Sequence, residues 1–344
     1  MAVRVAVVGL GAMGTTHFKA YGEFAGARVV AVCDPQERRL AGDWSAAACN
    51  LDTGGARRTD LAGIKTCVNF AAVLADPDVD LVDLCVPTFL HAEMTIAALE
   101  AGKHVFCEKP MARTSALARR MIRTAARCGR RLAIGHCLRF WPEYLALWEM
   151  IDSGRYGPVR TAHFVRLSSR PQWSWNHWLQ DPGRSGSAAL DLHIHDADVV
   201  RWFFGAPGKV TASAALDPAG GVAHIVTTYH YSKGPVVTAE GRWDLPEPFP
   251  FRMGATLVFE RAAVEFNSAQ SPTLTVYDGA SGKVEHPAVA AANAYAEELR
   301  YFVECIAAGT PPSRILPAEA AAAVALVEAE VKAALTGRAV KVKA

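Results

Sequence analysis

The chain has 344 residues, enough for two domains of about 150 residues each. Its composition, 51% hydrophobic and 20% charged, excludes global disorder, and 36 basic against 34 acidic residues exclude a nucleic-acid binder that relies on a broad basic surface. No apolar run reaches the ~18 residues of a membrane span, and we expect no export signal. Eight scattered cysteines without a C-x-x-C pair fit a reducing compartment, so we expect a soluble cytoplasmic protein.

The first part of the chain alternates between expected strands and helices. Residues 3–8 form a continuous apolar run, as in a strand buried on both faces. Further strands are expected at 28–33, 81–86, 105–107 and 131–134, with helices ending near 24 and spanning 94–101 and 114–128. This alternation predicts a doubly wound parallel sheet over residues 1–135.

Beyond about residue 136 the expected strands become longer and follow one another directly. They span 159–167, 210–215, 223–231, 235–243, 255–260 and 273–277, separated by Gly, Pro and Asp turns. One helix, at 187–204, interrupts them, and two more are expected at 294–308 and 317–335. The pattern predicts an α+β domain with an antiparallel sheet over residues 136–344.

A glycine-rich sequence follows the first expected strand. Gly9, Gly11 and Gly14 form Gly-x-Gly-x-x-Gly at the start of a helix, and Asp34 follows about 20 residues later at the end of the next strand. In this context the motif predicts a Rossmann domain, although a tight turn without a ligand is the alternative. Gly9 permits the turn, Gly11 lets the backbone approach a pyrophosphate, and Gly14 allows close packing of the helix.

The surrounding residues indicate which dinucleotide binds. The helix that begins at Ala12 and Met13 would present its backbone amides to the phosphates. Asp34 would accept hydrogen bonds from the adenosine ribose hydroxyls and repel a 2′-phosphate, which favours NAD. Arg38 and Arg39 are close by and leave NADP possible.

Glu108-Lys109-Pro110 directly follows the strand at 105–107. Ligands of open α/β sheets bind beyond the carboxyl ends of the strands. The bond to Pro110 would hold the Lys109 ammonium pointing into a cleft. The alternative is a solvated ion pair at the surface.

The densest polar cluster is Gly-Ser-Ala-Ala-Leu-Asp-Leu-His-Ile-His-Asp-Ala-Asp at 186–198. In a helix, Asp191 and His195 would share one face as i and i+4, while His193 would face elsewhere. A carboxylate beside an imidazole orients the ring and raises its basicity, as general base catalysis requires. The alternatives are a structural Asp–His pair and a metal site; no further His or Cys cluster supplies ligands, so we expect no metal.

Two more side chains are candidates for contact with a substrate. Trp178 follows Trp173 and Trp175 in a polar loop; its ring could stack on the apolar face of a sugar or polyol, or seal a domain interface. Arg139 could bind a substrate hydroxyl, carboxylate or phosphate with its bidentate fork, or anchor the contact between the domains.

Six distinct motifs are distributed along the whole chain. They are V-V-G-L-G-A-M-G at the start, V-P-T-F-L-H-A-E and A-G-K-H-V-F-C-E-K-P in the first domain, G-H-C-L-R-F-W-P at the junction, D-L-H-I-H-D-A-D-V-V-R-W in the second domain and A-Y-A-E-E-L-R-Y-F-V-E-C-I-A-A-G-T-P-P near the end. In this order they resemble the Gfo/Idh/MocA oxidoreductases, with inositol 2-dehydrogenase as the nearest well-known type.

The resemblance implies a Rossmann domain followed by an α+β domain with an open, mostly antiparallel sheet, through which members often form oligomers. We therefore expect a homo-oligomer, a dimer or a tetramer. The resemblance also implies a catalytic trio of Lys109, Asp191 and His195. It adds to the cofactor site Thr88, His91, Glu108 and Lys109. The chain departs from the family pattern in a long segment at 43–66 and in Ser187, which replaces a second glycine.

We expect an NAD(P)-dependent dehydrogenase that transfers a hydride between a secondary alcohol of a cyclic polyol or sugar and the nicotinamide. His195 would take the hydroxyl proton, Asp191 would orient His195, and Lys109 would hydrogen-bond the developing alkoxide. Two rivals share the fold: a non-catalytic regulator that senses the dinucleotide, and a glycosidase that uses bound NAD for a transient oxidation.

Overall fold

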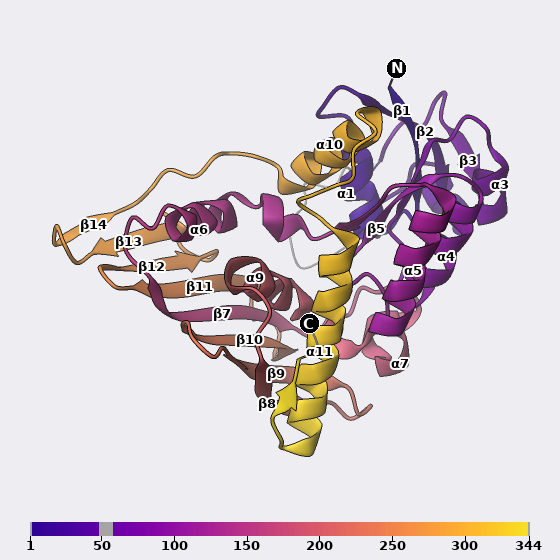
Figure 1. The fold of residues 1–344 in the computed structure, drawn as a ribbon. Coiled ribbons are helices and arrows are strands. Elements are labelled where there is room, and N and C mark those ends of the chain that lie inside the picture. The colour runs from indigo at the N-terminus through magenta and orange to yellow at the C-terminus, as the bar shows by residue number, and fades with distance from the viewer. Residues whose placement is uncertain (1, 48–57, 343–344) are drawn as a thin grey trace. The chain divides into compact units, whose positions relative to one another are not determined.

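The computed structural model describes residues 2–47 and 58–342, which form two compact units (Figure 1). The first unit contains residues 1–137, 173–176 and 293–321, and the second contains 138–172, 177–292 and 322–344. The first unit thus includes two later segments that the linear boundary at residue 135 assigns to the second domain. Cys49 and the middle of the long segment at 43–66 lie outside the described residues.

The first unit is built on a six-stranded parallel sheet. Its strand order is β3-β2-β1-β4-β5-β6, so the order reverses between β1 and β4. Val5, Ala6 and Val7 of β1 are fully buried, and since neighbouring residues point to opposite faces, the strand is covered on both faces, as expected. The strands are β1 (Val3–Val8), β2 (Ala27–Cys33), β3 (Lys65–Cys67), β4 (Leu81–Leu84), β5 (His104–Glu108) and β6 (Leu132–Gly135). The predicted doubly wound sheet is confirmed.

The helices of the first unit begin and end at recognisable signals. The Thr114 hydroxyl caps α5 by accepting the Leu117 amide, and Gly129 ends this helix with a left-handed φ of +61°. Helix α10, from the later part of the chain, packs on α1 (Figure 1). The helices are α1 (Ala12–Ala20), α2 (Glu37–Leu40), α3 (Phe70–Ala75), α4 (Thr88–Glu100), α5 (Ser115–Cys128) and α10 (Ala294–Ala307).

The second unit contains a nine-stranded, mostly antiparallel sheet, as predicted. Its order is β14-β13-β12-β11-β7-β10-β9-β8-β15, and only β7 and β10 pair in parallel among its described strands. Buried and half-buried residues alternate along β12, so one face of this strand lies in the core. The strands are β7 (Val159–Ser169), β8 (Lys209–Leu216), β9 (Val222–His230), β10 (Val236–Leu245), β11 (Arg252–Phe259), β12 (Ala262–Asn267), β13 (Leu274–Asp278), β14 (Lys283–Glu285) and β15 (Val340–Lys341).

The remaining helices correct the sequence-based expectation in two places. Helix α6 (Pro142–Asp152) precedes β7, and the short helix α7 (Pro182–Ser185) lies between β7 and β8, so the segment at 187–204 is not the only helical segment that interrupts the strands. That segment is also not one helix, because α8 (Ser187–Asp191) and α9 (Ile194–Phe204) are separate. Ser187 starts α8 with a φ of +60°, a left-handed conformation that favours glycine. The other helical segments are α11 (Pro317–Thr336) and the 3₁₀ turns Cys137–Phe140 and Trp175–Gln180.

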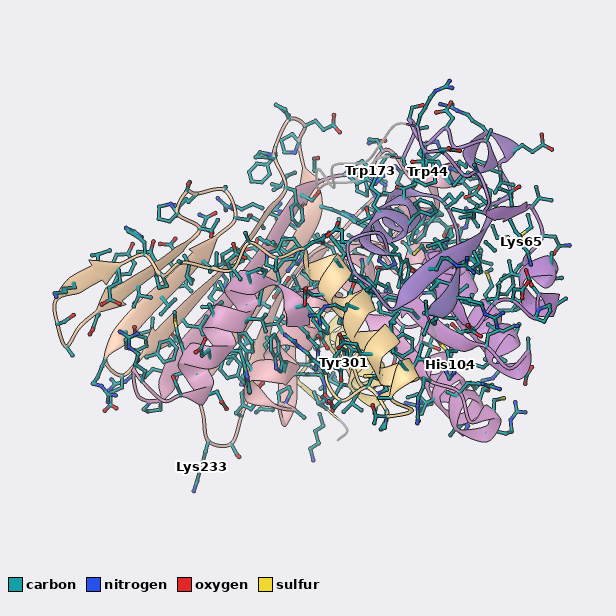
Figure 2. The ribbon with its side chains drawn as sticks, turned by 90° about the horizontal axis from the view of Figure 1, so that it is seen from above. Trp44, Lys65, His104, Trp173, Lys233 and Tyr301 are labelled. Carbon is teal, nitrogen blue, oxygen red and sulfur yellow. The ribbon has the colours of Figure 1, made fainter. Side chains whose placement is uncertain are left out.

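Within residues 2–47 and 58–342, no helix combines the length and apolar character needed to cross a membrane. None of the seven cysteines in these ranges forms a disulfide. Polar side chains occupy the turns, as Lys233 does between β9 and β10, where it projects away from the sheet (Figure 2).

Candidate active site

The glycine-rich loop after β1 has the shape of a phosphate cradle. Gly9 has a φ of +88°, and a Cβ there would lie 2.5 Å from the Cys85 carbonyl oxygen, so the turn requires glycine. A Cβ on Gly14 would lie 1.7 Å from the Gly9 oxygen, so α1 packs directly against the loop. At Gly11 no atom of the described residues lies within 4 Å of the corresponding position, which leaves the loop open to a ligand.

The start of α1 offers hydrogen-bond donors to an anion. Gly11 is the N-cap residue and has no side chain, so it supplies no acceptor to the first amides, at Ala12 and Met13. These amides and the helix dipole favour a phosphate group. The open space at Gly11 and the uncapped helix start therefore fit the pyrophosphate of a dinucleotide.

Asp34 follows β2 and is buried beside the loop. Its Oδ2 accepts the Leu10 amide at 2.7 Å, and its Oδ1 accepts the Gln36 amide at 2.9 Å. Arg39 Nη1 lies 3.1 Å from Oδ2, whereas Arg38 pairs with a different carboxylate. The carboxylate predicted to bind the ribose is thus held by the loop backbone, with one cation at its side.

Lys109 stands at the carboxyl end of β5, and the bond between Lys109 and Pro110 is cis. The Glu108 side chain turns into the interior, where its Oε2 accepts the Lys109 amide at 3.0 Å. A Cβ on Gly135, its neighbour on β6, would lie 3.0 Å from Oε1 of Glu108, so this glycine makes room for the carboxylate. Glu108, predicted in the cofactor site, therefore anchors the backbone of Lys109 from inside.

Thr88 and His91 occupy the first turns of α4, and both are buried. His91 Nδ1 lies 2.7 Å from the Pro110 oxygen, and its Nε2 lies 2.8 Å from the Val86 oxygen. Burial lowers the pKa of His91. The ring ties the turn after β4 to the turn after β5, so its effect on a cofactor would pass through these two turns.

Asp191 and His195 flank the break between α8 and α9. The amides of Leu192 and His193 lie 3.0 and 2.8 Å from the same Ala188 oxygen, so the second bond spans five residues. A wide turn of this π type inserts about one residue into a helix and displaces the following residues by about 100° around its axis. The prediction that Asp191 and His195 are i and i+4 of one regular helix is therefore wrong.

His193 fills the core beneath this break, a role that the sequence analysis missed. Its Nε2 lies 2.9 Å from Glu330 Oε2 on α11 and 3.3 Å from the Tyr229 hydroxyl oxygen. Burial lowers the pKa of His193, but the Glu330 carboxylate outweighs burial, and the pKa is raised. A Cβ on Gly241 of β10 would lie 2.7 Å from His193 Cβ, so this glycine makes room for the ring. The break is thus held by contacts from three other elements.

Arg139 and Trp178, the predicted substrate contacts, have partners within the second unit. Arg139 Nε and Nη2 each lie 2.8 Å from an oxygen of Asp198, and the pair is buried. Trp178 is partly buried against a hydrophobic cluster that includes Leu192 and Trp243. These contacts fasten both side chains locally, and their contact with a substrate stays a prediction.

Comparison with known protein families agrees with this geometry. A model of the Gfo/Idh/MocA oxidoreductase family, described by its NAD-binding Rossmann fold, matches residues 3–136. The model of the C-terminal domain of the same family matches residues 144–265. The chain belongs to the Gfo/Idh/MocA family. Its expected fold class, its NAD cofactor and its place among the oxidoreductases are thereby confirmed.

Three similar proteins illustrate the family. Inositol 2-dehydrogenase of Streptomyces avermitilis is 31% identical over 97% of this chain and 92% of its own length. 1,5-Anhydro-D-fructose reductase of Ensifer adhaerens is 37% identical over 44% of this chain and 46% of its own length. A levoglucosan dehydrogenase, solved with NADH and levoglucosan, covers 100% of both chains with a TM-score of 0.83 at 22% identity. This last similarity shows the fold.

The Rossmann unit of this Gfo/Idh/MocA protein also gathers titratable side chains that the sequence analysis gave no role. His17, Asp83 and Cys85 offer ligand-type atoms within 4.8 Å of one another, and so do His17, Glu108 and Glu298. Among the described residues, no such group includes the His-x-His-Asp motif of the second unit. The signal for this cluster is a histidine and a glutamate at helix positions where the pattern places buried apolar residues.

Proposed function

We propose that this Gfo/Idh/MocA protein is an NAD-dependent dehydrogenase that acts on a secondary alcohol of a cyclic polyol or sugar. The observation that carries the proposal is similarity over nearly the whole chain to an inositol 2-dehydrogenase, in a chain that contains Lys109, Asp191 and His195. The other two proteins are named for 1,5-anhydro-D-fructose and levoglucosan, which supports a cyclic substrate.

The chemistry divides among a few side chains. NAD⁺ supplies the acceptor for the hydride that leaves the carbinol carbon. His195 takes the hydroxyl proton as general base, and Asp191 orients the His195 ring. Lys109 donates a hydrogen bond to the substrate oxygen as negative charge develops there. Arg139 and Trp178 would contact the hydroxyls and the ring of the substrate.

The proposal assigns a task to each part of the chain. Residues 1–135 bind the dinucleotide, with the pyrophosphate on the loop and helix start at 9–14 and the ribose on Asp34. Thr88, His91 and Glu108 shape the nicotinamide end of this site together with Lys109. Residues 136–344 bind the substrate and join copies of the chain into a dimer or tetramer. We place the protein in the cytoplasm, which its unpaired cysteine spacing supports.

A screen of NAD⁺ reduction by wild-type protein across cyclic polyols and free sugars, with myo-inositol among them, tests the proposal. We expect NADH to form with at least one of them, and linear alcohols of the same size are the control. Tight NAD⁺ binding without turnover of any alcohol would favour the regulator. Release of an aglycone from a glycoside without net NADH would favour the glycosidase.

A further inference from the structure

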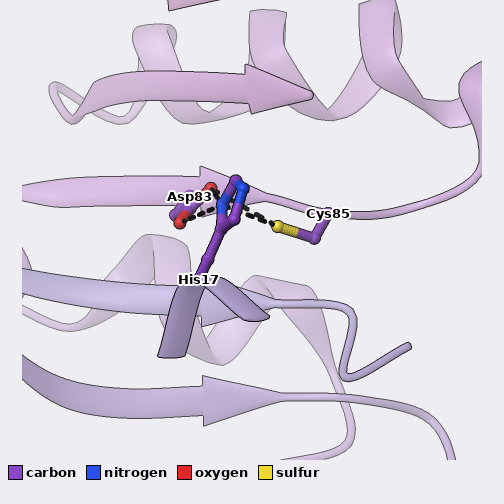
Figure 3. Close-up of side chains that lie close together, drawn as sticks. All are labelled: His17, Asp83 and Cys85. Atoms are coloured by element: carbon purple, nitrogen blue, oxygen red, sulfur yellow. Dashed lines mark hydrogen bonds and ion pairs between the residues drawn. The ribbon is translucent and has the colours of Figure 1, made fainter. Parts of the chain in front are cut away.

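His17 joins the ends of two neighbouring strands in the core of the first unit. It lies on α1 and is fully buried. Its Nδ1 lies 3.0 Å from Asp83 Oδ2 on β4 and 3.3 Å from the sulfur of Cys85, just after that strand (Figure 3). On the other side of the ring, Nε2 lies 3.2 Å from Oε1 of Glu108, the last residue of β5. The imidazole therefore connects β4 to the residue that precedes Lys109.

Carboxylates on both sides of the ring favour its cationic form. Burial lowers the pKa of His17, but Cys85 and Asp83 outweigh burial and raise the pKa well above its usual value. Nδ1 is within hydrogen-bond distance of Asp83, and Nε2 forms an ion-pair contact with Glu108, so a doubly protonated ring places its positive charge between the two carboxylates. Burial also raises the pKa values of the Cys85 thiol and the Tyr21 hydroxyl.

Glu298 covers the cluster from α10 without adding charge. It is fully buried, and within the described structure neither carboxylate oxygen has a hydrogen-bond partner. Burial raises the pKa of Glu298 well above its ordinary value, and Glu108 adds to the rise. Burial also opposes ionisation of Glu108, but His17 outweighs it, and the pKa of Glu108 is lowered. One cation thus stands between the carboxylates of β4 and β5, and Glu298 holds a proton.

We propose that His17 is a positioning residue for Lys109. The two carboxylate oxygens of Glu108 contact different groups. Oε1 contacts the His17 ring, and Oε2 accepts a hydrogen bond from the Lys109 amide at 3.0 Å. Rotation of this carboxylate would break one of the two contacts, so the ring of His17 fixes the backbone that carries the Lys109 ammonium. The inference rests on the proposed function, because it acts through the proposed catalytic lysine.

A double-mutant cycle tests the coupling between the two residues. His17→Gln is made in the wild-type chain and in Lys109→Ala, and kcat for NAD⁺ reduction is measured with the best polyol or sugar of the screen. If His17 acts through Lys109, His17→Gln lowers kcat by about 10- to 100-fold in the wild-type chain and by less than about twofold beside Lys109→Ala. The dissociation constant of NAD⁺ should change by no more than about threefold in both.

Two results would overturn the proposal. Equal losses of kcat in the two backgrounds would show that His17 acts independently of Lys109. A loss of NAD⁺ affinity as large as the loss of kcat would show that the cluster supports the glycine loop as a whole. Thr95→Val, at another buried polar position of this unit, is the control for a general effect on the core. Full activity of Lys109→Ala would contradict the proposed function itself, which separates the two failures.

Two further measurements keep the test decisive if His17→Gln does not fold. Asp83→Asn retains the ring and removes one of its anchors, so it should give a smaller loss of kcat that also disappears beside Lys109→Ala. In wild-type protein with ¹⁵N-labelled histidine, the buried His17 ring should still carry protons on both nitrogens at a pH above the ordinary histidine pKa of about 6.5. A ring with a single proton, or a stoichiometric metal ion bound to it, would contradict the proposal.

Discussion

The two units hold their proposed catalytic side chains in different ways. In the first unit Lys109 stands where a parallel strand ends, the place where any open α/β sheet collects its ligands. In the second unit Asp191 and His195 flank a wide turn between two helices, a place that no general rule of the fold marks. Sheet topology therefore positions the lysine, whereas side-chain contacts from other elements hold the helix break that carries the pair.

A buried imidazole supports each arrangement, and the surroundings of the two rings differ. His17 lies between two carboxylates, while a protonated Glu298 covers the cluster. His193 has one carboxylate partner, Glu330, and one hydroxyl neighbour, Tyr229. The first ring refines a position that the sheet already sets, and the second supports the helix break itself. Changes around His193 should therefore disturb the backbone more than changes around His17.

Removal of the proposed base in the second unit should have the largest effect. His195→Ala should lower kcat by about 10²- to 10⁴-fold and leave NAD⁺ affinity nearly unchanged, because the imidazole acts on the substrate. Asp191→Asn should also lower kcat. When it is combined with His195→Ala, the two losses should overlap rather than multiply, since the two residues act as a unit. Lys109→Ala should lower kcat and leave the bound nicotinamide less well ordered. Steady-state kinetics measure kcat, and NAD⁺ titration measures the affinity for the cofactor. Full activity of His195→Ala would eliminate this mechanism.

The helix break can be disturbed from the neighbouring strand. Gly241→Ala would place a Cβ 2.7 Å from His193 Cβ, which cannot move far in the core. We expect it to lower the free energy of unfolding by about 1–3 kcal/mol and to lower kcat more than NAD⁺ affinity. Gly208→Ala is the matched control, because its Cβ would meet only an ordinary contact at 3.6 Å. Urea denaturation and kinetics test this, and equal behaviour of the two variants would contradict the role given to the break.

The cluster in the first unit should make stability depend on pH. Because the folded pKa of Glu298 is raised, the folded chain keeps a proton that the unfolded chain releases above its ordinary pKa. The free energy of unfolding should therefore fall as pH rises above about 5, by up to about 1.4 kcal/mol per pH unit for this proton. Glu298→Gln removes this contribution and should flatten the curve, whereas Glu297→Gln, on the exposed side of α10, should not. Urea denaturation at several pH values checks it, and parallel curves would refute it.

The smallest effect concerns the choice of cofactor. NAD⁺ should bind more tightly than NADP⁺, because the Asp34 carboxylate is expected to accept hydrogen bonds from the ribose hydroxyls and to repel a 2′-phosphate. Asp34→Ala should bring the two dissociation constants closer together. Arg39 Nη1 lies 3.1 Å from Asp34 Oδ2, so Arg39→Ala should weaken the binding of NADP⁺ by about tenfold. Arg38→Ala should change the dissociation constant of neither dinucleotide, because the Arg38 side chain pairs with a different carboxylate. Dissociation constants for both dinucleotides test this, and tighter binding of NADP⁺ by wild-type protein would contradict it.

The sequence predicts the first unit better than the second for a physical reason. Gly9, Gly14 and Asp34 are required by backbone geometry within a single strand-helix-strand segment, so their spacing carries the information. The helix break is different, because the His193 amide can bond to the carbonyl four or five residues back. The contact of His193 with Glu330, which is far away in the sequence, helps to determine which of these two hydrogen bonds forms.

The same limit applies to the cluster around His17. Asp83 lies next to the last residue of β4 and Glu108 ends the adjacent strand β5, so both could be placed from the predicted sheet order. Glu298 could not, because α10 returns to the first unit after the whole second sheet. A local pattern therefore finds residues that one segment positions and misses those that depend on distant segments meeting in the core.

Isotope transfer tests the central claim most directly. Wild-type protein is incubated with NAD⁺ and the cyclic polyol or sugar of highest turnover, deuterated at its carbinol carbons, and the NADH is examined by NMR and mass spectrometry. The account predicts one deuteron at C4 of the nicotinamide for each carbonyl product formed, because the hydride passes directly from the carbinol carbon. NADH without deuterium, or deuterium returned to the product without net NADH, would contradict it.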